Sequence, residues 1–230
     1  MNLYYIFIIL FISTYFINYL LIKNNLFLDS KKISIHKNFV HNRHKVSYVG
    51  GLIILVSYIF FWNSDDLLFK VFLLFIFLLG LLSDLGLLHS PLKRFFLQSI
   101  VIFSFLLLFD VKISSDRLIF LNFLLDQKIL NLLFTTFCIL IVVNGSNFMD
   151  GLNTLTAGYC LLILFSIIFV LTKNEINFSN YNLLTITIVS LIVVFIYNMF
   201  GKIYLGDNGA YLIAFVISFI LIEFSGKNYI

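Results

Sequence analysis

The chain has 230 residues, of which 61% are hydrophobic and 11% charged, and its mean hydropathy is +1.06. These values exclude an ordinary soluble domain and indicate an integral membrane protein. The formal charge of +4 does not indicate nucleic-acid binding, because the basic residues lie mainly in one loop beside an apolar run. Cys138 and Cys160 lie in or beside apolar runs, so we interpret them as small buried residues rather than as a disulfide.

Apolar runs of about 15 to 20 residues, separated by short polar loops, predict helical spans rather than the strands of a transmembrane barrel. We therefore predict an all-α fold, a polytopic transmembrane helix bundle of about eight spans that forms one integral membrane domain over residues 1–230. The apolar segment Leu118–Leu125 is expected to lie in the membrane interface. In chain order the expected spans are Leu3–Ile22, Val49–Trp62, Leu67–Leu82, Phe95–Phe109, Ile129–Val143, Gly158–Leu171, Leu183–Phe200 and Ala210–Phe224.

Four polar segments fall on the same side of the membrane in this topology. The loop 23–47, which overlaps the first of them, carries six Lys and Arg residues and is therefore expected in the cytoplasm. Each segment leads into the N-terminus of a span, where free backbone amides and the helix dipole favour anions, so we expect an anionic cytoplasmic substrate. The segments are HNRHKVSYVGGL (41–52), SDLGLLHSPLKR (83–94), NGSNFMDGLNT (144–154) and GKIYLGDNG (201–209).

The third segment is the most unusual, because it places amides, a carboxylate and glycines between two long apolar runs. If the preceding helix continues through it, Asn144, Asn147 and Asp150 recur every three residues and share one face. Asn147 and Asp150, together with Asp84 and Asp207, supply the oxygen ligands suited to magnesium bound to a diphosphate, and too few soft ligands for zinc or copper. Taken singly, each acidic residue has a simpler interpretation as a helix cap or turn residue.

Two groups of basic residues have alternative interpretations. Lys93 and Arg94 precede an apolar run, so they are either interfacial anchors or groups that neutralise a phosphate. His36, His41 and His44 have no common zinc-site spacing, which favours a solvated or headgroup-facing loop.

These motifs resemble those of the polyprenyl-phosphate N-acetylhexosamine-1-phosphate transferases, a group within glycosyltransferase family 4 that includes undecaprenyl-phosphate GlcNAc-1-phosphate transferases. The resemblance extends over roughly residues 30 to 225, and its most specific part is the Asn/Asp/Gly stretch. It is carried by Asn144-x-x-Asn147-x-x-Asp150-Gly151-Leu152-Asn153, by Gly206-Asp207-Asn208-Gly209, by Ser83-Asp84 followed by Lys93, Arg94 and Gln98, and by Arg43-His44 ahead of Gly50-Gly51.

The resemblance implies an enzyme that transfers an N-acetylhexosamine 1-phosphate from a UDP-sugar, such as UDP-N-acetylglucosamine, to undecaprenyl or another polyprenyl phosphate. UMP is released, and the product enters cell-wall or lipopolysaccharide synthesis. The implied location is the bacterial inner membrane, with the active site facing the cytoplasm. The resemblance is compatible with a monomer or a homodimer.

The resemblance also implies a cofactor and a set of site residues. Mg²⁺, or Mn²⁺ in its place, would be held by Asp207 and Asn147, with Asp150 near the metal and Asp84 beside the attacking lipid phosphate. The catalytic residues are then Asp84, Asp150 and Asp207, and the substrate-binding residues are Asn144, Lys93, Arg94, His44, Gly206 and Gly209.

The chain departs from the family pattern in two places. Ser83 stands where the family usually has a first aspartate, and its hydroxyl can only donate or accept a hydrogen bond. The family continues with further helices and a late cytoplasmic loop, so we expect a fragment or a shortened member, and an inactive relative is one alternative. The other is a transporter or channel, which predicts polar residues near the middle of the spans.

Overall fold

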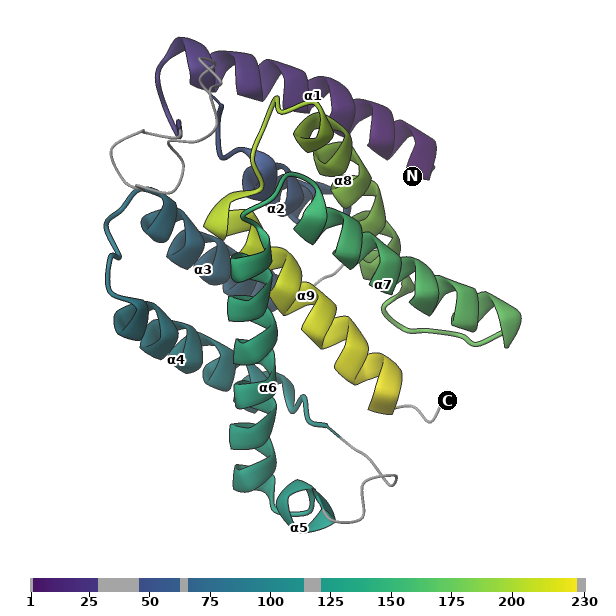
Figure 1. The fold of residues 1–230 in the computed structure, drawn as a ribbon. Coiled ribbons are helices and arrows are strands. Elements are labelled where there is room, and N and C mark those ends of the chain that lie inside the picture. Colours follow the sequence, from purple (N-terminus) through teal and green to yellow (C-terminus); the bar gives the residue numbers. More distant parts are fainter. Residues whose placement is uncertain (1, 29–45, 63–65, 114–120, 227–230) are drawn as a thin grey trace.

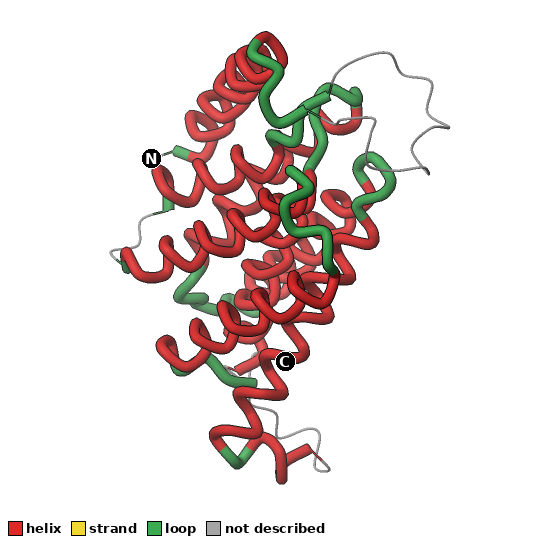
Figure 2. Tube along the Cα trace, turned by 90° about the vertical axis from the view of Figure 1, so that its left-hand side faces the viewer, coloured by secondary structure: helices red, strands yellow, loops and turns green. Residues whose placement is uncertain are grey.

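Helices make up most of the chain that the computed structural model describes, which is residues 2–28, 46–62, 66–113 and 121–226. They lie side by side with mostly short connections between them (Figures 1 and 2). In chain order they are α1 (Leu3–Lys23), α2 (Gly50–Phe61), α3 (Leu67–Asp84), α4 (Pro91–Phe109), α5 (Asn122–Leu125), α6 (Lys128–Met149), α7 (Leu155–Lys173), α8 (Tyr181–Met199) and α9 (Gly206–Gly226).

Seven of the described helices, α1, α3, α4 and α6 to α9, are long and apolar enough to cross a membrane. Helix α2 is equally apolar but has only 12 residues. Each of the eight expected spans corresponds to one of these helices, so the prediction of an all-α polytopic membrane bundle is confirmed. Helix α5 covers the last part of the segment expected at the interface, of which residues 118–120 lie outside the described chain.

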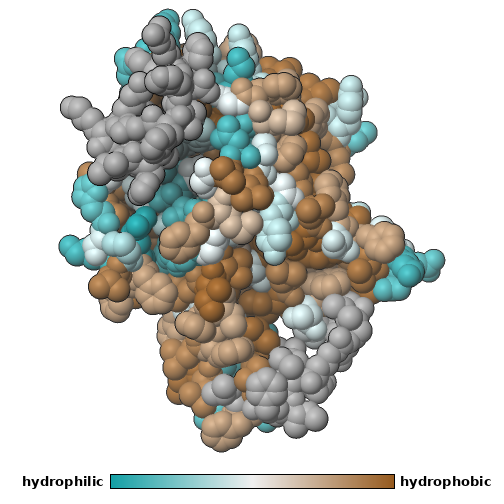
Figure 3. Space-filling model, in the orientation of Figure 1, coloured by the Kyte–Doolittle hydropathy of each residue, from teal (hydrophilic) through white to brown (hydrophobic). Residues whose placement is uncertain are grey.

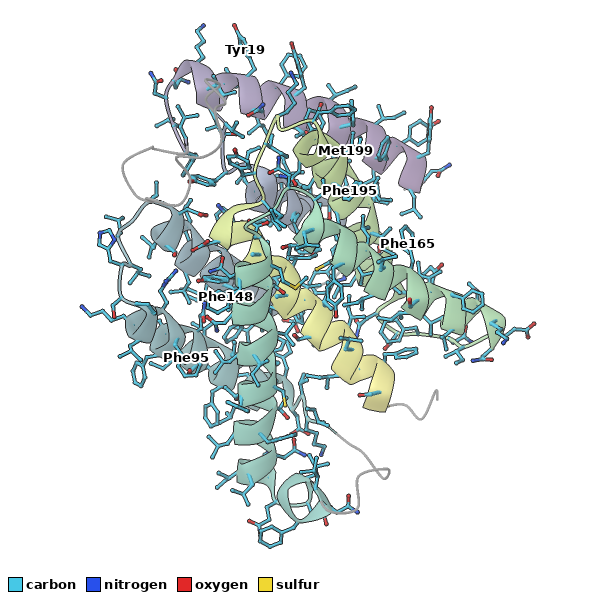
Figure 4. The ribbon with its side chains drawn as sticks, viewed as in Figure 1. Tyr19, Phe95, Phe148, Phe165, Phe195 and Met199 are labelled. Atoms are coloured by element: carbon cyan, nitrogen blue, oxygen red, sulfur yellow. The ribbon has the colours of Figure 1, made fainter. Side chains whose placement is uncertain are left out.

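Helix α9 lies at the centre of the bundle, where it packs against α2, α3 and α6 (Figure 1). All of its side chains from Ala210 to Ile220 are buried. The outer helices instead expose large apolar side chains, and Figure 4 shows Tyr19, Phe95 and Phe165 on the outside of the bundle. Figure 3 shows the same apolar character as brown over most of the visible face, with teal gathered at the upper left. The apolar exterior is the surface expected of spans surrounded by lipid.

The close packing of α2, α3 and α9 depends on glycine. A Cβ at Gly51 would overlap the side-chain oxygen of Asn208, and one at Gly80 would overlap the backbone of the same residue. Small residues at such positions let membrane helices approach each other closely. The first turn of α9 is therefore wedged between α2 and α3, at the end of the bundle where the polar segments begin.

Four helices extend further into the polar segments than hydropathy predicted, and one of them is α4, which begins at Pro91 instead of Phe95. Helix α6 continues past Val143 to Met149, and α9 begins at Gly206 instead of Ala210. The added turns are polar, and several of their polar groups are bonded within the protein; the Asn144 amide, for example, donates to the Leu140 carbonyl at 2.9 Å. Helix α3 likewise ends at Asp84 rather than at Leu82, because the side chain of Asp84 is bound to α9.

Candidate functional site

The described parts of the four polar segments meet at one end of the bundle, as the sequence predicted. The segment before α2 runs beside the segment before α9, where the Gly50 N–H donates to the Tyr204 carbonyl at 3.1 Å. The Asn198 side chain, at the end of α8, accepts a hydrogen bond from the Thr154 N–H and donates one to the Ile203 carbonyl at 2.9 Å. These bonds connect the starts of α2, α7 and α9.

Asp84 connects the second segment, residues 83–94, to this group and binds the N-terminus of α9. Its Oδ1 accepts from the Asp207 N–H at 2.9 Å, and its Oδ2 accepts from the Asn208 N–H at 3.0 Å. The Asn208 side-chain amide also donates to Oδ2 at 2.7 Å and to the Tyr48 carbonyl at 3.3 Å. The anion that the start of α9 attracts is therefore a carboxylate of the protein itself, supplied by α3 rather than by a cap within α9.

Asp207 is not the N-cap that its position alone suggested, because it lies inside the first turn of α9. Its Oδ2 accepts hydrogen bonds from the Ser83 hydroxyl and from Nη1 of Arg94, the latter at 3.3 Å. Arg94 also donates to the Ser83 hydroxyl oxygen at 2.8 Å. The side chains of Asp207 and Arg94 are 27% and 23% exposed, so this ion pair is accessible from the solvent side of the site.

Asn144 and Asn147 do lie on one helix, since α6 runs through both. The Asn147 amide donates to the hydroxyl of Tyr211 at 3.5 Å, one turn beyond Asp207 on α9. The Tyr211 hydroxyl also interacts with the Ser83 side chain. The Asn144 amide donates to Oε1 of the buried Gln98 at 3.0 Å and so fastens α6 to α4.

The remaining site residues of the sequence prediction are placed differently. Asp150 is the C-cap residue of α6, where its N–H donates to the Ser146 carbonyl at 3.1 Å. The exposed Lys93 makes no side-chain hydrogen bond or ion pair with the described residues, whereas its neighbour Arg94 does. His44 lies outside the described chain, together with His36 and His41.

Gly206 and Gly209 shape the turn. Gly206 has a φ of +75°, a left-handed conformation that favours glycine, and a Cβ there would come within 2.9 Å of Asp84 Oδ2. A Cβ at Gly209 would come within 3.0 Å of the Gly51 N–H nitrogen. Both glycines allow the backbone of α9 to approach its neighbours.

The oxygen atoms left over at this site suit a hard divalent cation. No group of three or more His, Cys, Asp or Glu among the described residues could hold a metal by itself. In the described chain, the Asp207 carboxylate accepts hydrogen bonds through Oδ2, and the Asn147 side chain donates one through Nδ2. Oδ1 of each residue can therefore accept a further ligand. One carboxylate and one amide oxygen, completed by water and substrate phosphates, match the coordination that Mg²⁺ prefers.

Sequence reasoning missed Tyr211, Asn198 and the bridging role of Ser83. Tyr211 is counted among the hydrophobic residues and lies in an apolar run, although its spacing of four residues from Asp207 places both on one face of α9. Asn198 gave no local signal, because its partners are backbone groups of two other segments.

Comparison with known families gives one match. The family model described as Glycosyl transferase family 4 matches residues 67–225, which is more than half of the chain and runs from the start of α3 to the end of α9. Comparison with curated proteins gives no match.

Proposed function

Because the chain belongs to glycosyl transferase family 4, whose members transfer a sugar phosphate to a polyprenyl phosphate, we propose the following specific reaction. The protein transfers an N-acetylhexosamine 1-phosphate from a UDP-sugar to undecaprenyl phosphate and releases UMP. It works in the bacterial inner membrane with the polar end of the bundle in the cytoplasm, and its product enters cell-wall or surface-polysaccharide synthesis.

The reaction brings two anions together. An oxygen of the lipid phosphate attacks the phosphorus bonded to the sugar, and the bond from that phosphorus to the oxygen of UMP breaks. The protein has little covalent chemistry to perform, so its tasks are to position both phosphates and to neutralise their charge. Mg²⁺ or Mn²⁺, held by Oδ1 of Asp207 and Oδ1 of Asn147, would supply most of that neutralisation at the diphosphate.

The Arg94 guanidinium supplies the second positive charge. It is already at the site, paired with Asp207 and partly exposed, and its planar set of donors suits a phosphate. Lys93 contributes charge from the exposed side of α4. Asp150 contacts the sugar nucleotide near the cation, and Asn144 holds α6 in place through Gln98.

Asp84 has a role in this proposal that its hydrogen bonds support directly. Its two oxygens accept from the first amides of α9, so it fixes the backbone that carries Asp207. A place beside the attacking lipid phosphate is compatible with this anchoring, because a carboxylate has further lone pairs.

One observation carries the proposal: the carboxylate of Asp207 is held at the meeting point of all four polar segments, with one oxygen bonded to protein donors and the other unengaged by the described residues. The distribution of charge disfavours a transporter or channel, for which charged groups would be expected along the spans. In the described helices, all charged side chains lie in the first or last turn: Lys23, Lys70, Asp84, Lys93, Arg94, Lys128, Lys173, Asp207 and Glu223.

The test is release of UMP by the purified chain in lipid nanodiscs that contain undecaprenyl phosphate. UDP-N-acetylglucosamine and UDP-N-acetylgalactosamine are supplied in parallel, with and without Mg²⁺. We expect Mg²⁺-dependent UMP release that requires the lipid phosphate, and a loss of at least about a hundredfold in Asp207→Asn. The matched control is Asp110→Asn, because Asp110 is exposed at the other end of α4 and pairs only loosely with Lys128, at 3.9 Å.

Each result has a distinct meaning. Normal UMP release by Asp207→Asn would overturn the metal-ligand role of Asp207. Absence of UMP from the unaltered chain with both UDP-hexosamines would overturn the proposed donor. Ion or solute flux through liposomes without UMP formation would support a transporter instead.

A further inference from the structure

Ser83 occupies the position between the two charged groups of the site. It is the second-last residue of α3, Arg94 belongs to the first turn of α4, and Asp207 to the first turn of α9. The Arg94 Nη1 lies 2.8 Å from the Ser83 hydroxyl oxygen and 3.3 Å from Asp207 Oδ2, so the contact of Arg94 with serine is the shorter one. The hydroxyl also donates to Asp207 Oδ2. Ser83 thus bridges an arginine and an aspartate that lie on different helices.

The direction of these hydrogen bonds follows from the inventory of donors. A guanidinium has no acceptor, so Ser83 must accept from Arg94, and a carboxylate has no proton, so Ser83 must donate its single proton to Asp207. Oδ2 of Asp207 therefore receives two donors, one from a neutral hydroxyl and one from a cation. The backbone of the same residue is held by Asp84 through the Asp207 N–H. Both the start of the side chain and one of its oxygens are then fixed, which determines the direction of the other oxygen.

We propose that Ser83 is a positioning residue for Asp207: its hydroxyl orients the carboxylate so that Oδ1 faces the divalent cation, and it keeps Arg94 beside that cation site. This inference rests on the proposed function. An aspartate at position 83 could not act in the same way, because as a carboxylate it would repel Asp207 and draw Arg94 to itself. Serine at position 83, in place of the usual acidic residue, therefore changes the hydrogen bonds between positions 83, 94 and 207 but does not remove them.

Direct binding of Mn²⁺ to the full chain in detergent, without either substrate, measures this role. The free Mn²⁺ signal in electron paramagnetic resonance gives the dissociation constant. We expect Ser83→Ala to raise it roughly ten- to hundredfold, which is typical for loss of a side chain that orients a metal ligand. Ser83→Thr keeps the hydroxyl and is expected to stay close to the unaltered protein. The matched control is Ser166→Ala on α7, because the exposed Ser166 hydroxyl bonds, among the described residues, only to the Leu162 carbonyl of its own helix.

The UMP assay supplies a second readout. A positioning residue is expected to raise the Mg²⁺ concentration needed for half-maximal activity while kcat at saturating Mg²⁺ falls much less. Ser83→Cys, which has a similar volume but a weak donor, is expected to weaken Mn²⁺ binding as well and replaces Ser83→Ala if that variant does not fold.

Equal Mn²⁺ dissociation constants for the unaltered protein, Ser83→Ala and Ser83→Cys would overturn the inference. So would a loss of binding in Ser83→Thr as large as in Ser83→Ala, because the hydroxyl would then be irrelevant. Failure of the unaltered protein both to bind Mn²⁺ and to release UMP would instead overturn the proposed function.

Discussion

Replacement of Asp84 is expected to destabilise the first turn of α9. The carboxylate accepts three hydrogen bonds, from the Asp207 N–H at 2.9 Å, the Asn208 N–H at 3.0 Å and the Asn208 side chain at 2.7 Å. Each contributes at least about 1 kcal/mol net, because the acceptor is charged, so Asp84→Ala is expected to lose about 3 kcal/mol or more of unfolding free energy. The loss is increased because Asn208 is completely buried and its amide would keep only the Tyr48 carbonyl at 3.3 Å.

Asp84→Asn is expected to have a smaller effect. Its single carbonyl oxygen can take the place of Oδ2 and keep both donors of Asn208, which leaves its amide facing the Asp207 N–H. The expected loss is then about 2 kcal/mol, from one lost hydrogen bond and two facing donors, the Asp207 N–H and the new amide, that lack an acceptor. The order of stability should therefore be aspartate, asparagine, alanine.

The measurement is the thermal midpoint of the purified protein in one detergent, followed by circular dichroism. The control is Asp66→Asn, since Asp66 caps α3 through the Phe69 N–H at 3.2 Å and asparagine is an equally good cap. Equal midpoints for Asp84→Ala and the unaltered protein would refute the reasoning, because three hydrogen bonds would have been removed without cost. Full loss of UMP release together with an unchanged midpoint would assign Asp84 to chemistry alone.

Two further substitutions test the packing and the charge of the site. Gly51→Ala is expected to destabilise the bundle by about 3 kcal/mol or more, because the new Cβ overlaps Asn208, and expression and thermal midpoint in detergent report it. Gly145→Ala, in open space inside α6, should be neutral or stabilising by about 1 kcal/mol; if both glycine variants melt alike, close packing at Gly51 is not the cause. Arg94→Gln is expected to lower kcat/KM for the lipid phosphate roughly ten- to hundredfold through loss of a charged hydrogen bond, and Lys93→Gln, outside the hydrogen-bonded cluster, much less. Equal effects of the two in steady-state kinetics would show that only overall charge matters.

The membrane fold could be predicted from the sequence because spans are set by local composition. Each apolar run reports its own burial in lipid, whatever its neighbours are, so eight helices could be identified one at a time. The ends of the helices were less predictable. At α6 and α9 the last or first turn is polar. The Asn144 amide donates to the Leu140 carbonyl and Asp84 accepts from the first amides of α9, and hydropathy registers neither of these bonds.

The candidate site was likewise predictable only in part from the sequence. The placement of the four polar segments on one side of the membrane could be predicted by counting spans, because each span carries the chain to the opposite side. The partner of each side chain did not follow, because Asp84 and Asp207 are separated by more than a hundred residues in sequence and meet only through the packing of α3 on α9. Hydrogen bonds of that kind have no signature in either local segment.

The sequence by itself determined that this protein is a helical membrane bundle with acidic and amide groups at one end, because composition and chain reversal depend only on local residues. The tertiary structure alone decided how those groups are used. It assigned the carboxylate of Asp84 to the amides of α9 and joined Asp207 to Arg94 through Ser83. The physical reason is that a carboxylate near three helix ends binds whichever donors the packing brings within reach, and that packing is set here by Gly51 and Gly80.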